Sequence, residues 1–250
     1  MVGRVEKYFL QRIKAEGSIH VTLIDPEKVT SAQAAKIAEN SKASGTAAVM
    51  IGGSTLVSQT HLDEVVQAIK RVKLPTILFP NNVTGISRCA DAIWFMSLLN
   101  SVDPYFLIGA QILGAPLVKK FGLEPISMGY VIVGEGGTAA IMGKAIPVPY
   151  DKPELAAAHA LAGQYLGMHF LYLEGGSGAK NPVPPEMIRV VKQCIEIPLV
   201  VGGGIRTREQ ALAASSAGAD IIVTGNVTET GDTKGKISDI IAGINASHSS

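Results

Sequence analysis

A carboxylate followed by glycines is the first feature of this sequence that suggests chemistry. Glu174 comes directly after the apolar run His169–Leu173 and is followed by Gly175-Gly176-Ser177-Gly178. A carboxylate at the end of a strand, in a loop that a ligand can approach closely, is a candidate general base for a hydroxyl group. Tyr172 could orient the ligand through its phenol or could pack inside the protein. Glu174 could instead cap a helix or pair with a surface cation, but we favour the base.

Two glycine-containing loops suggest a phosphate site. The run Leu199–Val201 is followed by Gly202-Gly203-Gly204-Ile205-Arg206-Thr207. The run Asp220–Thr224 ends in Thr224 and is followed by Gly225-Asn226. Glycines let backbone N–H groups approach a phosphate, and the start of the next helix adds a positive dipole. Either loop alone more often makes a tight turn. Because both follow neighbouring strands, we predict a phosphate cradle.

Asp25 and Ser54 are candidate ligands for a divalent metal ion. Asp25 follows the run Ile19–Ile24, and Ser54 lies in Gly52-Gly53-Ser54-Thr55 after the run Ala47–Ile51. Mg²⁺ needs few carboxylates when water and phosphate oxygens complete its shell. Taken separately, Asp-Pro and Gly-Gly-Ser more often open a turn or a helix. The magnesium site is therefore a hypothesis that needs both residues at one place.

The elements that must position these residues alternate along the chain. Runs of β-branched and aliphatic residues, separated by segments of helical periodicity, are typical of a parallel sheet. The eight predicted strands are Ile19–Ile24, Ala47–Ile51, Thr76–Phe79, Ala92–Phe95, Ile126–Val133, His169–Leu173, Leu199–Val201 and Asp220–Thr224. This pattern predicts an α/β fold of the (β/α)8 or TIM barrel type, as one domain over residues 1–250. In such barrels the chemistry lies at the carboxyl ends of the strands.

Helix starts are predicted from pairs in which a capping side chain is answered three residues later. These pairs are Thr30 with Gln33, Thr60 with Asp63, Asp151 with Glu154, and Thr207 with Gln210, while Pro184 and Pro185 also suit a helix entrance.

The third β/α unit is too short for a regular helix. Only Pro80–Asp91 separates the third strand from the fourth, and it contains proline, glycine and asparagine. We therefore expect a barrel with a shortened or missing third helix and an opening in its outer ring. The following segment, Leu98–Leu123, is rich in large apolar residues. It could form the wall of a lipid-binding groove, although ordinary helix packing or an oligomer contact is the commoner meaning of such a stripe.

Composition excludes several classes of protein. The 250 residues are 47% apolar and 17% charged with a net charge of +1, which gives no broad basic field for nucleic acid. Cys89 and Cys194 lie far apart without partners at ligand spacing, so we expect no zinc site and a cytoplasmic location. The apolar stretch Tyr105–Val118 is interrupted by glycine and proline and is too short to cross a bilayer.

Taken in order, the motifs resemble the geranylgeranylglyceryl phosphate synthase family, and the second of its two groups in particular. The residues that carry the resemblance are Leu23-Ile24-Asp25-Pro26-Glu27-Lys28, Gly52-Gly53-Ser54, Leu78-Phe79-Pro80, Phe95-Met96-Ser97-Leu98-Leu99-Asn100-Ser101, Gly129-Tyr130, Tyr172-Leu173-Glu174, Val201-Gly202-Gly203-Gly204-Ile205-Arg206 and Thr224-Gly225-Asn226. They span nearly the whole chain. Gly175 stands where the family pattern leads us to expect alanine.

The resemblance implies an enzyme of archaeal ether lipid biosynthesis. It would join sn-glycerol 1-phosphate to geranylgeranyl diphosphate with Mg²⁺ as cofactor and release diphosphate. Asp25 and Ser54 would hold the metal, and Glu174 would be the base. The glycerol phosphate would meet Tyr172, Leu173, Glu174, Gly175, Gly176, Ser177, Gly178, Gly203, Gly204, Gly225 and Asn226. We also expect a homo-oligomer and transient contact of the lipid product with a membrane surface.

Two other functions fit the same barrel, and a related bacterial-type enzyme could use a longer prenyl chain. A flavin-dependent oxidoreductase could place the flavin phosphate in the same cradle, and a non-catalytic barrel could bind phosphate without turnover.

Overall fold

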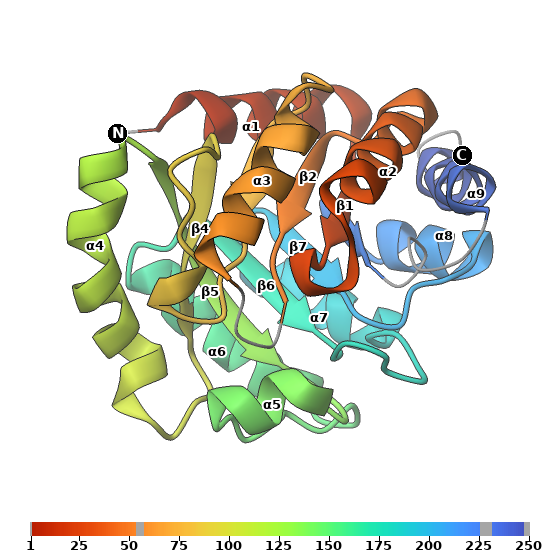
Figure 1. The fold of residues 1–250 in the computed structure, drawn as a ribbon. Coiled ribbons are helices and arrows are strands. Elements are labelled where there is room, and N and C mark those ends of the chain that lie inside the picture. The colour runs from red at the N-terminus through yellow and green to blue at the C-terminus, as the bar shows by residue number, and fades with distance from the viewer. Residues whose placement is uncertain (1, 54–57, 226–231, 248–250) are drawn as a thin grey trace.

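In the computed structural model, the described residues (2–53, 58–225 and 232–247) form eight parallel strands that close into a barrel (Figure 1). The strands are β1 (Ile19–Ile24), β2 (Ala48–Ile51), β3 (Thr76–Leu78), β4 (Ala92–Leu98), β5 (Glu124–Ile132), β6 (Phe170–Glu174), β7 (Leu199–Gly202) and β8 (Ile221–Thr224). β8 closes the barrel on β1, with Ile221 opposite Ile19. The predicted (β/α)8 barrel is therefore confirmed, with strand ends shifted by a few residues.

Helices and short turns connect the strands on the outside of the barrel (Figure 1). The α-helices are α1 (Arg4–Glu16), α2 (Ser31–Ser44), α3 (Gln59–Lys70), α4 (Ala110–Phe121), α5 (Gly137–Gly143), α6 (Pro153–Tyr165), α7 (Pro185–Cys194), α8 (Arg208–Ser216) and α9 (Thr233–Ala246). Two 3-10 turns, η1 (Pro26–Lys28) and η2 (Val83–Gly85), and the π-turn η3 (Tyr105–Gly109) complete the order. Among the helices of the described residues, none has the length and apolar character that a bilayer crossing requires.

The third unit lacks its helix, as the sequence predicts. Between β3 and β4, where every residue is described, the chain makes only the three-residue turn η2. α4 contacts η2 from the next unit instead. The outer ring is therefore thin at this point.

The strands are covered on both faces, which explains their continuous apolar sequence. Along β1, Val21 packs inside the barrel, whereas Ile24 packs outward in a cluster with Ala34 of α2 and Val65 of α3. This alternation decides which residues of each strand end can face the mouth of the barrel.

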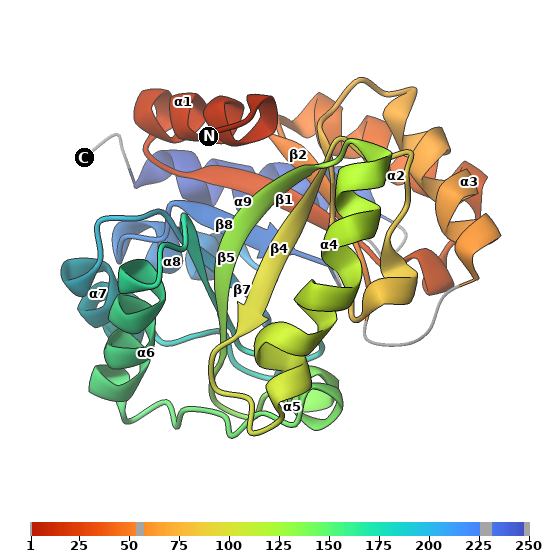
Figure 2. The same cartoon turned by 90° about the vertical axis from the view of Figure 1, so that its left-hand side faces the viewer.

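The amino-terminal helix covers the end of the barrel opposite to α5 (Figure 2). Phe9 of α1 is fully buried and stacks on Trp94 of β4, with ring centroids 5.9 Å apart. Phe170 meets the Trp94 ring edge-on at 5.2 Å. Trp94 is therefore a core residue.

Helix starts were predicted with mixed success. Thr30 and Thr207 form the expected capping boxes with Gln33 and Gln210, and Pro185 is the first residue of α7. The pairs at Thr60 and Asp151 are wrong. α3 begins one residue before Thr60 with Ser58 as its N-cap, and α6 begins at Pro153, whose fixed backbone angle suits a first helical position.

Candidate functional site

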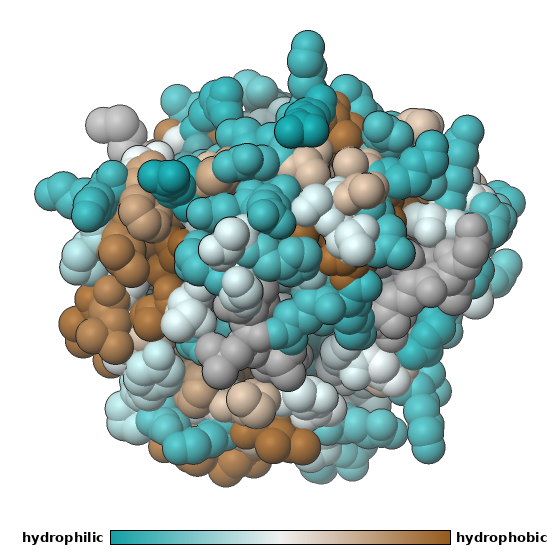
Figure 3. Space-filling view, viewed as in Figure 1, coloured by the Kyte–Doolittle hydropathy of each residue, from teal (hydrophilic) through white to brown (hydrophobic). Residues whose placement is uncertain are grey.

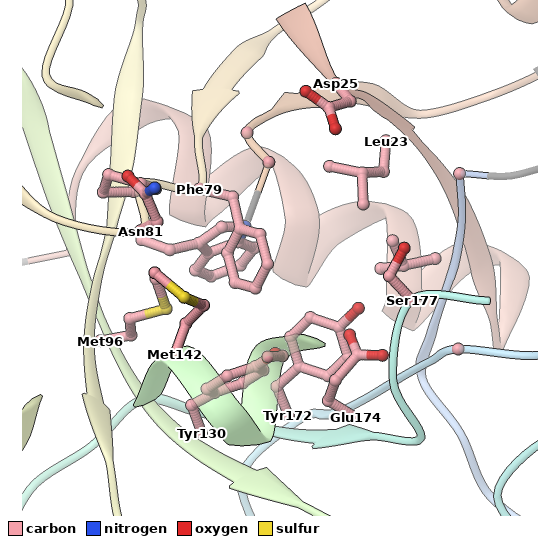
Figure 4. Close-up of a pocket in the computed structure, with 18 of the residues that line it drawn as sticks. Leu23, Asp25, Phe79, Asn81, Met96, Tyr130, Met142, Tyr172, Glu174 and Ser177 are labelled. Atoms are coloured by element: carbon pink, nitrogen blue, oxygen red, sulfur yellow. The ribbon is translucent and has the colours of Figure 1, made fainter. Parts of the chain in front are cut away.

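A cavity of about 750 Å³ opens at the carboxyl ends of the strands (Figure 4). Many of the residues proposed from the sequence line this one cavity, namely Asp25, Tyr172, Glu174, Gly176, Ser177, Gly178, Gly203, Gly204 and Gly225. They come from the ends of β1, β6, β7 and β8, which are neighbours around the barrel. Ser54 and Asn226 lie outside the described residues.

Glu174 is the last residue of β6 and is 6% exposed. Its Oε1 accepts the backbone N–H of Gly176 at 2.7 Å. Burial raises the pKa of the Glu174 carboxyl, and the hydrogen bonds from Gly176 and Tyr172 only partly oppose that rise. A carboxylate with a raised pKa holds an accepted proton more readily near neutral pH, as a general base requires.

The two residues before Glu174 point to opposite sides of β6. Tyr172 is 1% exposed and lines the cavity from inside the barrel. The backbone of Gly202 passes so close to the Tyr172 hydroxyl that any side chain there would overlap it. Leu173 packs outward among the helices, because side chains alternate along a strand. Its side chain therefore turns away from the cavity.

The loop after β7 runs against Glu174. Gly203 has a φ of +84°, in the region that favours glycine. A Cβ added at Gly203 would lie 2.6 Å from Glu174 Oε1 and 2.8 Å from the backbone nitrogen of Gly176. The glycine is thus needed both for the turn and for close approach to the β6 loop. Together these loops bring backbone and little side chain to the cavity, which leaves room for the close approach of a phosphate.

Asp25 lies across the cavity from Glu174 (Figure 4). It is the N-cap of η1, and its Oδ1 accepts the backbone N–H of Glu27 at 3.1 Å. The Gly53 backbone passes against the Asp25 carboxylate with no room for a side chain. The ends of β1 and β2 therefore meet here, through Asp25 and Gly53, and the metal site stays a hypothesis because Ser54 lies outside the described residues.

The cavity continues into an apolar arm beside the missing third helix. Its walls come from η2 and the residue that follows it, from β4, from η3 and from one side of α4. The residues are Val83, Ile86, Phe95, Met96, Phe106, Ala110, Gly114 and Val118. Gly114 keeps the helix close, since an added Cβ would lie 3.3 Å from Ile86. Ile108 of η3, and Ile112 and Leu113 on the other side of α4, are more than half exposed. The apolar segment Leu98–Leu123 thus both lines a groove and presents an exposed stripe.

Sequence reasoning missed a polar residue in this apolar arm. Gln111 lines the cavity, and its amide Nε2 donates to the carbonyl of Met96. Its Oε1 is buried and has no hydrogen-bond partner among the described residues. Single glutamines in a helical stretch are common, so no sequence pattern marked it.

Phe79 and Tyr130 also line the cavity, although only the family resemblance singled them out in the sequence. Tyr130 is the register partner of Tyr172 on the adjacent strand. The pairing of β5 with β6 was the signal that could have placed it at the site.

Comparison with known proteins adds to this geometry. Residues 11–244 match the PcrB family. The chain belongs to the PcrB family. It is 54% identical over 230 residues to a geranylgeranylglyceryl phosphate synthase of Thermofilum pendens, covering 92% of this chain and 90% of the relative. It is 56% identical over 229 residues to the synthase of Thermococcus gammatolerans, covering 91% and 90%. The resemblance predicted from the motifs is confirmed.

Solved structures agree with this membership of the PcrB family. The crystal structure of (S)-3-O-geranylgeranylglyceryl phosphate synthase from Thermoplasma acidophilum, in complex with sn-glycerol-1-phosphate, matches with a TM-score of 0.94 and 38% identity. The match covers 98% of this chain and all of that one. Tryptophan synthase from M. tuberculosis matches with a TM-score of 0.62 at 16% identity, which shows the shared barrel fold alone.

Gly175 departs from the pattern expected for the family without disturbing the site. Its φ is not among the positive values, and an added Cβ would lie 3.3 Å from the Tyr150 hydroxyl. Alanine would therefore fit this position with a tight contact. Glycine here changes the space beside Tyr150 and leaves the cradle as it is.

Proposed function

We propose that this protein is a prenyltransferase that joins sn-glycerol 1-phosphate to geranylgeranyl diphosphate, forming an ether lipid phosphate and releasing diphosphate. The observation that carries the proposal is the single cavity. It joins a buried carboxylate and phosphate-binding loops at one end to an apolar arm at the other. A polar phosphate and a long hydrocarbon chain can bind there together, as this reaction requires. Relatives named as this synthase support the same reaction.

Glu174 is the proposed base in this reaction. The loops after β6, β7 and β8 hold the glycerol phosphate, and the buried carboxylate accepts the proton of the attacking hydroxyl. Fixing the hydroxyl and the allylic carbon in contact supplies part of the rate enhancement by itself. The Tyr172 hydroxyl donates a hydrogen bond to the Glu174 carboxylate, which lowers the Glu174 pKa against the larger effect of burial.

Magnesium is the proposed cofactor, and the donors at the barrel mouth suit it. Within the described residues there is no group of three His, Cys, Asp or Glu that could form a closed metal site. Mg²⁺ needs no such cage, because it keeps several waters and binds through one or two carboxylates and phosphate oxygens. Asp25, with Ser54, would hold the ion, whose chemistry is to neutralise charge on the diphosphate.

Exchange of Glu174 for glutamine tests the proposed base. We expect Glu174→Gln to lower kcat by about 100- to 10,000-fold, the usual worth of a positioned base. Its affinity for sn-glycerol 1-phosphate, measured by calorimetry, should stay within a few-fold of the parent. Glu154→Gln on the exposed start of α6 is the matched control and should change neither. Unchanged turnover in Glu174→Gln would remove this residue from the base role.

A further inference from the structure

Three aromatic rings meet at the floor of the cavity. The ring centroids of Phe79 and Tyr130 lie 5.5 Å apart, those of Phe79 and Tyr172 5.7 Å, and those of Tyr130 and Tyr172 5.3 Å. The two tyrosines pair in register on β5 and β6, and Phe79 follows directly after β3. Figure 4 shows all three among the residues that face the cavity.

Packing alone does not account for this group of rings. The interior layers of such barrels are usually filled by Val, Ile and Leu. The second aromatic group, around Trp94, fills the opposite end of the barrel and is almost fully buried. Phe79 is only partly buried, and Tyr130 keeps 7% of its surface exposed. The rings of Phe79, Tyr130 and Tyr172 therefore form a wall against which a ligand can lie.

The electrostatics of this wall favour a cation. Aromatic faces carry partial negative charge, and an opposed cation within about 6 Å is attracted to them. Among the described residues, the cation that lies over an aromatic ring is Arg12. It lies over Tyr8, outside the cavity. The charged group that acts on Tyr130 and Tyr172 is the carboxylate of Glu174. Both phenols have a raised pKa, mainly from burial, and therefore stay neutral.

The rings also border the space between the two ends of the proposed reaction. Asp25, on the diphosphate side, and Glu174, on the glycerol side, stand on opposite sides of the cavity, and Phe79 lies to one side of the space between them, toward Asn81 and Met96 (Figure 4). The apolar arm begins beside Phe79 with Met96 and Ile93. A prenyl chain in that arm, with its diphosphate at Asp25, brings its first carbon over the rings.

We propose that Phe79, Tyr130 and Tyr172 form an aromatic box that stabilises positive charge on the allylic carbon during transfer. The proposal rests on the proposed function and adds a catalytic role to its site. As the bond between the allylic carbon and the diphosphate oxygen breaks, both electrons leave with the diphosphate. The glycerol oxygen then supplies the pair that forms the ether bond, and its proton passes to Glu174. Between these two events the allylic carbon carries positive charge. The faces of the three rings in the aromatic box stabilise that charge.

Stepwise fluorination of Phe79 tests the aromatic box. Replacing Phe79 by mono-, di- and trifluorinated phenylalanine keeps the shape of the ring and progressively removes the negative charge on its face. We expect kcat to fall steadily along the series, by about tenfold in total, which corresponds to about 1.4 kcal/mol of barrier. The KM for geranylgeranyl diphosphate should change little, because the uncharged chain gains nothing from the charge on the ring.

The same series at Phe121 is the matched control. Phe121 ends α4 and packs in the outer core, away from the cavity. Its fluorination should leave kcat unchanged. A flat series at Phe79, or an equal slope at Phe121, would overturn the aromatic box. An unmodified protein that makes no product at all would instead refute the proposed function, so the two failures are distinguishable.

Two variants of Tyr130 separate the ring from its hydroxyl. Tyr130→Phe keeps the aromatic face and should retain kcat within a few-fold, whereas Tyr130→Leu should lose about tenfold or more. Calorimetry with sn-glycerol 1-phosphate checks that both variants keep the folded cradle. A loss in Tyr130→Phe as large as that in Tyr130→Leu would show that the hydroxyl matters, against the proposal.

Discussion

Gly203 offers the sharpest perturbation of the phosphate cradle, because the structure gives both its strain and its clash. Gly203→Ala places a Cβ at a φ of +84°, 2.6 Å from Glu174 Oε1. Gly167, after α6, has nearly the same φ, +85°, but an added Cβ meets nothing within 4 Å. Gly167→Ala therefore carries the backbone strain alone and is the matched control.

The two variants should differ by the cost of displacing Glu174 and the backbone nitrogens of Gly175 and Gly176, which the added Cβ would approach to 2.9 and 2.8 Å. Positive φ costs an alanine about 1–2 kcal/mol at either position. In Gly203→Ala the carboxylate must also move away from the Gly176 N–H, and a hydrogen bond to a charged group is worth about 1.5–3 kcal/mol. Urea unfolding should show this extra loss only for Gly203→Ala.

Activity should separate the two variants further. If the hydrogen bond from the Gly176 N–H to Glu174 stabilises the transition state, its loss in Gly203→Ala lowers kcat/KM for sn-glycerol 1-phosphate about 10- to 100-fold. Gly167→Ala should keep the parent value wherever it is folded. Equal losses of stability, with kcat/KM unchanged in both, would refute the packing of the β7 loop against Glu174.

Three further predictions concern stability, the unusual glycine and self-association. Burial lowers the pKa of His20 to about 3 from 6.5, so the folded state resists protonation and loses stability as the pH falls below 6.5. Urea unfolding should show about 2 kcal/mol less stability at pH 5 than at pH 8, and the same loss in His20→Gln would contradict that origin. Gly175→Ala should leave activity intact and change stability by less than about 1 kcal/mol, because the new methyl group makes one tight contact, 3.3 Å from the Tyr150 hydroxyl, and ordinary contacts with the carbonyl oxygens of Gly202 and Gly203. A large loss of activity would show that the site needs glycine there. We propose that the homo-oligomer forms through the exposed apolar side chains that gather over α4 (Figure 3). Ile112→Glu should then shift the mass measured by sedimentation to that of the monomer. An unchanged mass would place the contact elsewhere.

Much of the barrel could be predicted because its strands are buried on both faces and are apolar throughout. The missing third helix was equally predictable, since Pro80–Asp91 is too short to hold one. Helix starts were harder. At Thr60 and Asp151 the capping pattern is present, but Ser58 and Pro153 start those helices instead. Local propensity alone could not decide between starts one or two residues apart.

The site was predictable where chemistry follows strand ends and less so where it depends on register. Glu174 and Gly203 were proposed from the sequence, and the structure brings them into contact range. The aromatic box depends on the alignment of β5 with β6 and on the approach of Phe79, which no single segment contains. Gln111 was missed because its burial comes from the fold of the α4 unit. The metal position of Ser54, the single domain, membrane contact of the product and the cytoplasmic location stay predictions.

Product formation by the purified protein separates a prenyltransferase from a barrel that only binds phosphate. The purified protein is incubated with radiolabelled sn-glycerol 1-phosphate, Mg²⁺ and prenyl diphosphates of increasing length, and the label that passes into organic solvent is counted beside the diphosphate released. We predict extractable label with the C20 diphosphate, in equal amount to released diphosphate and absent when Mg²⁺ is chelated. No extractable label with any prenyl length, from protein that still binds sn-glycerol 1-phosphate, would contradict the account and leave a barrel that only binds phosphate.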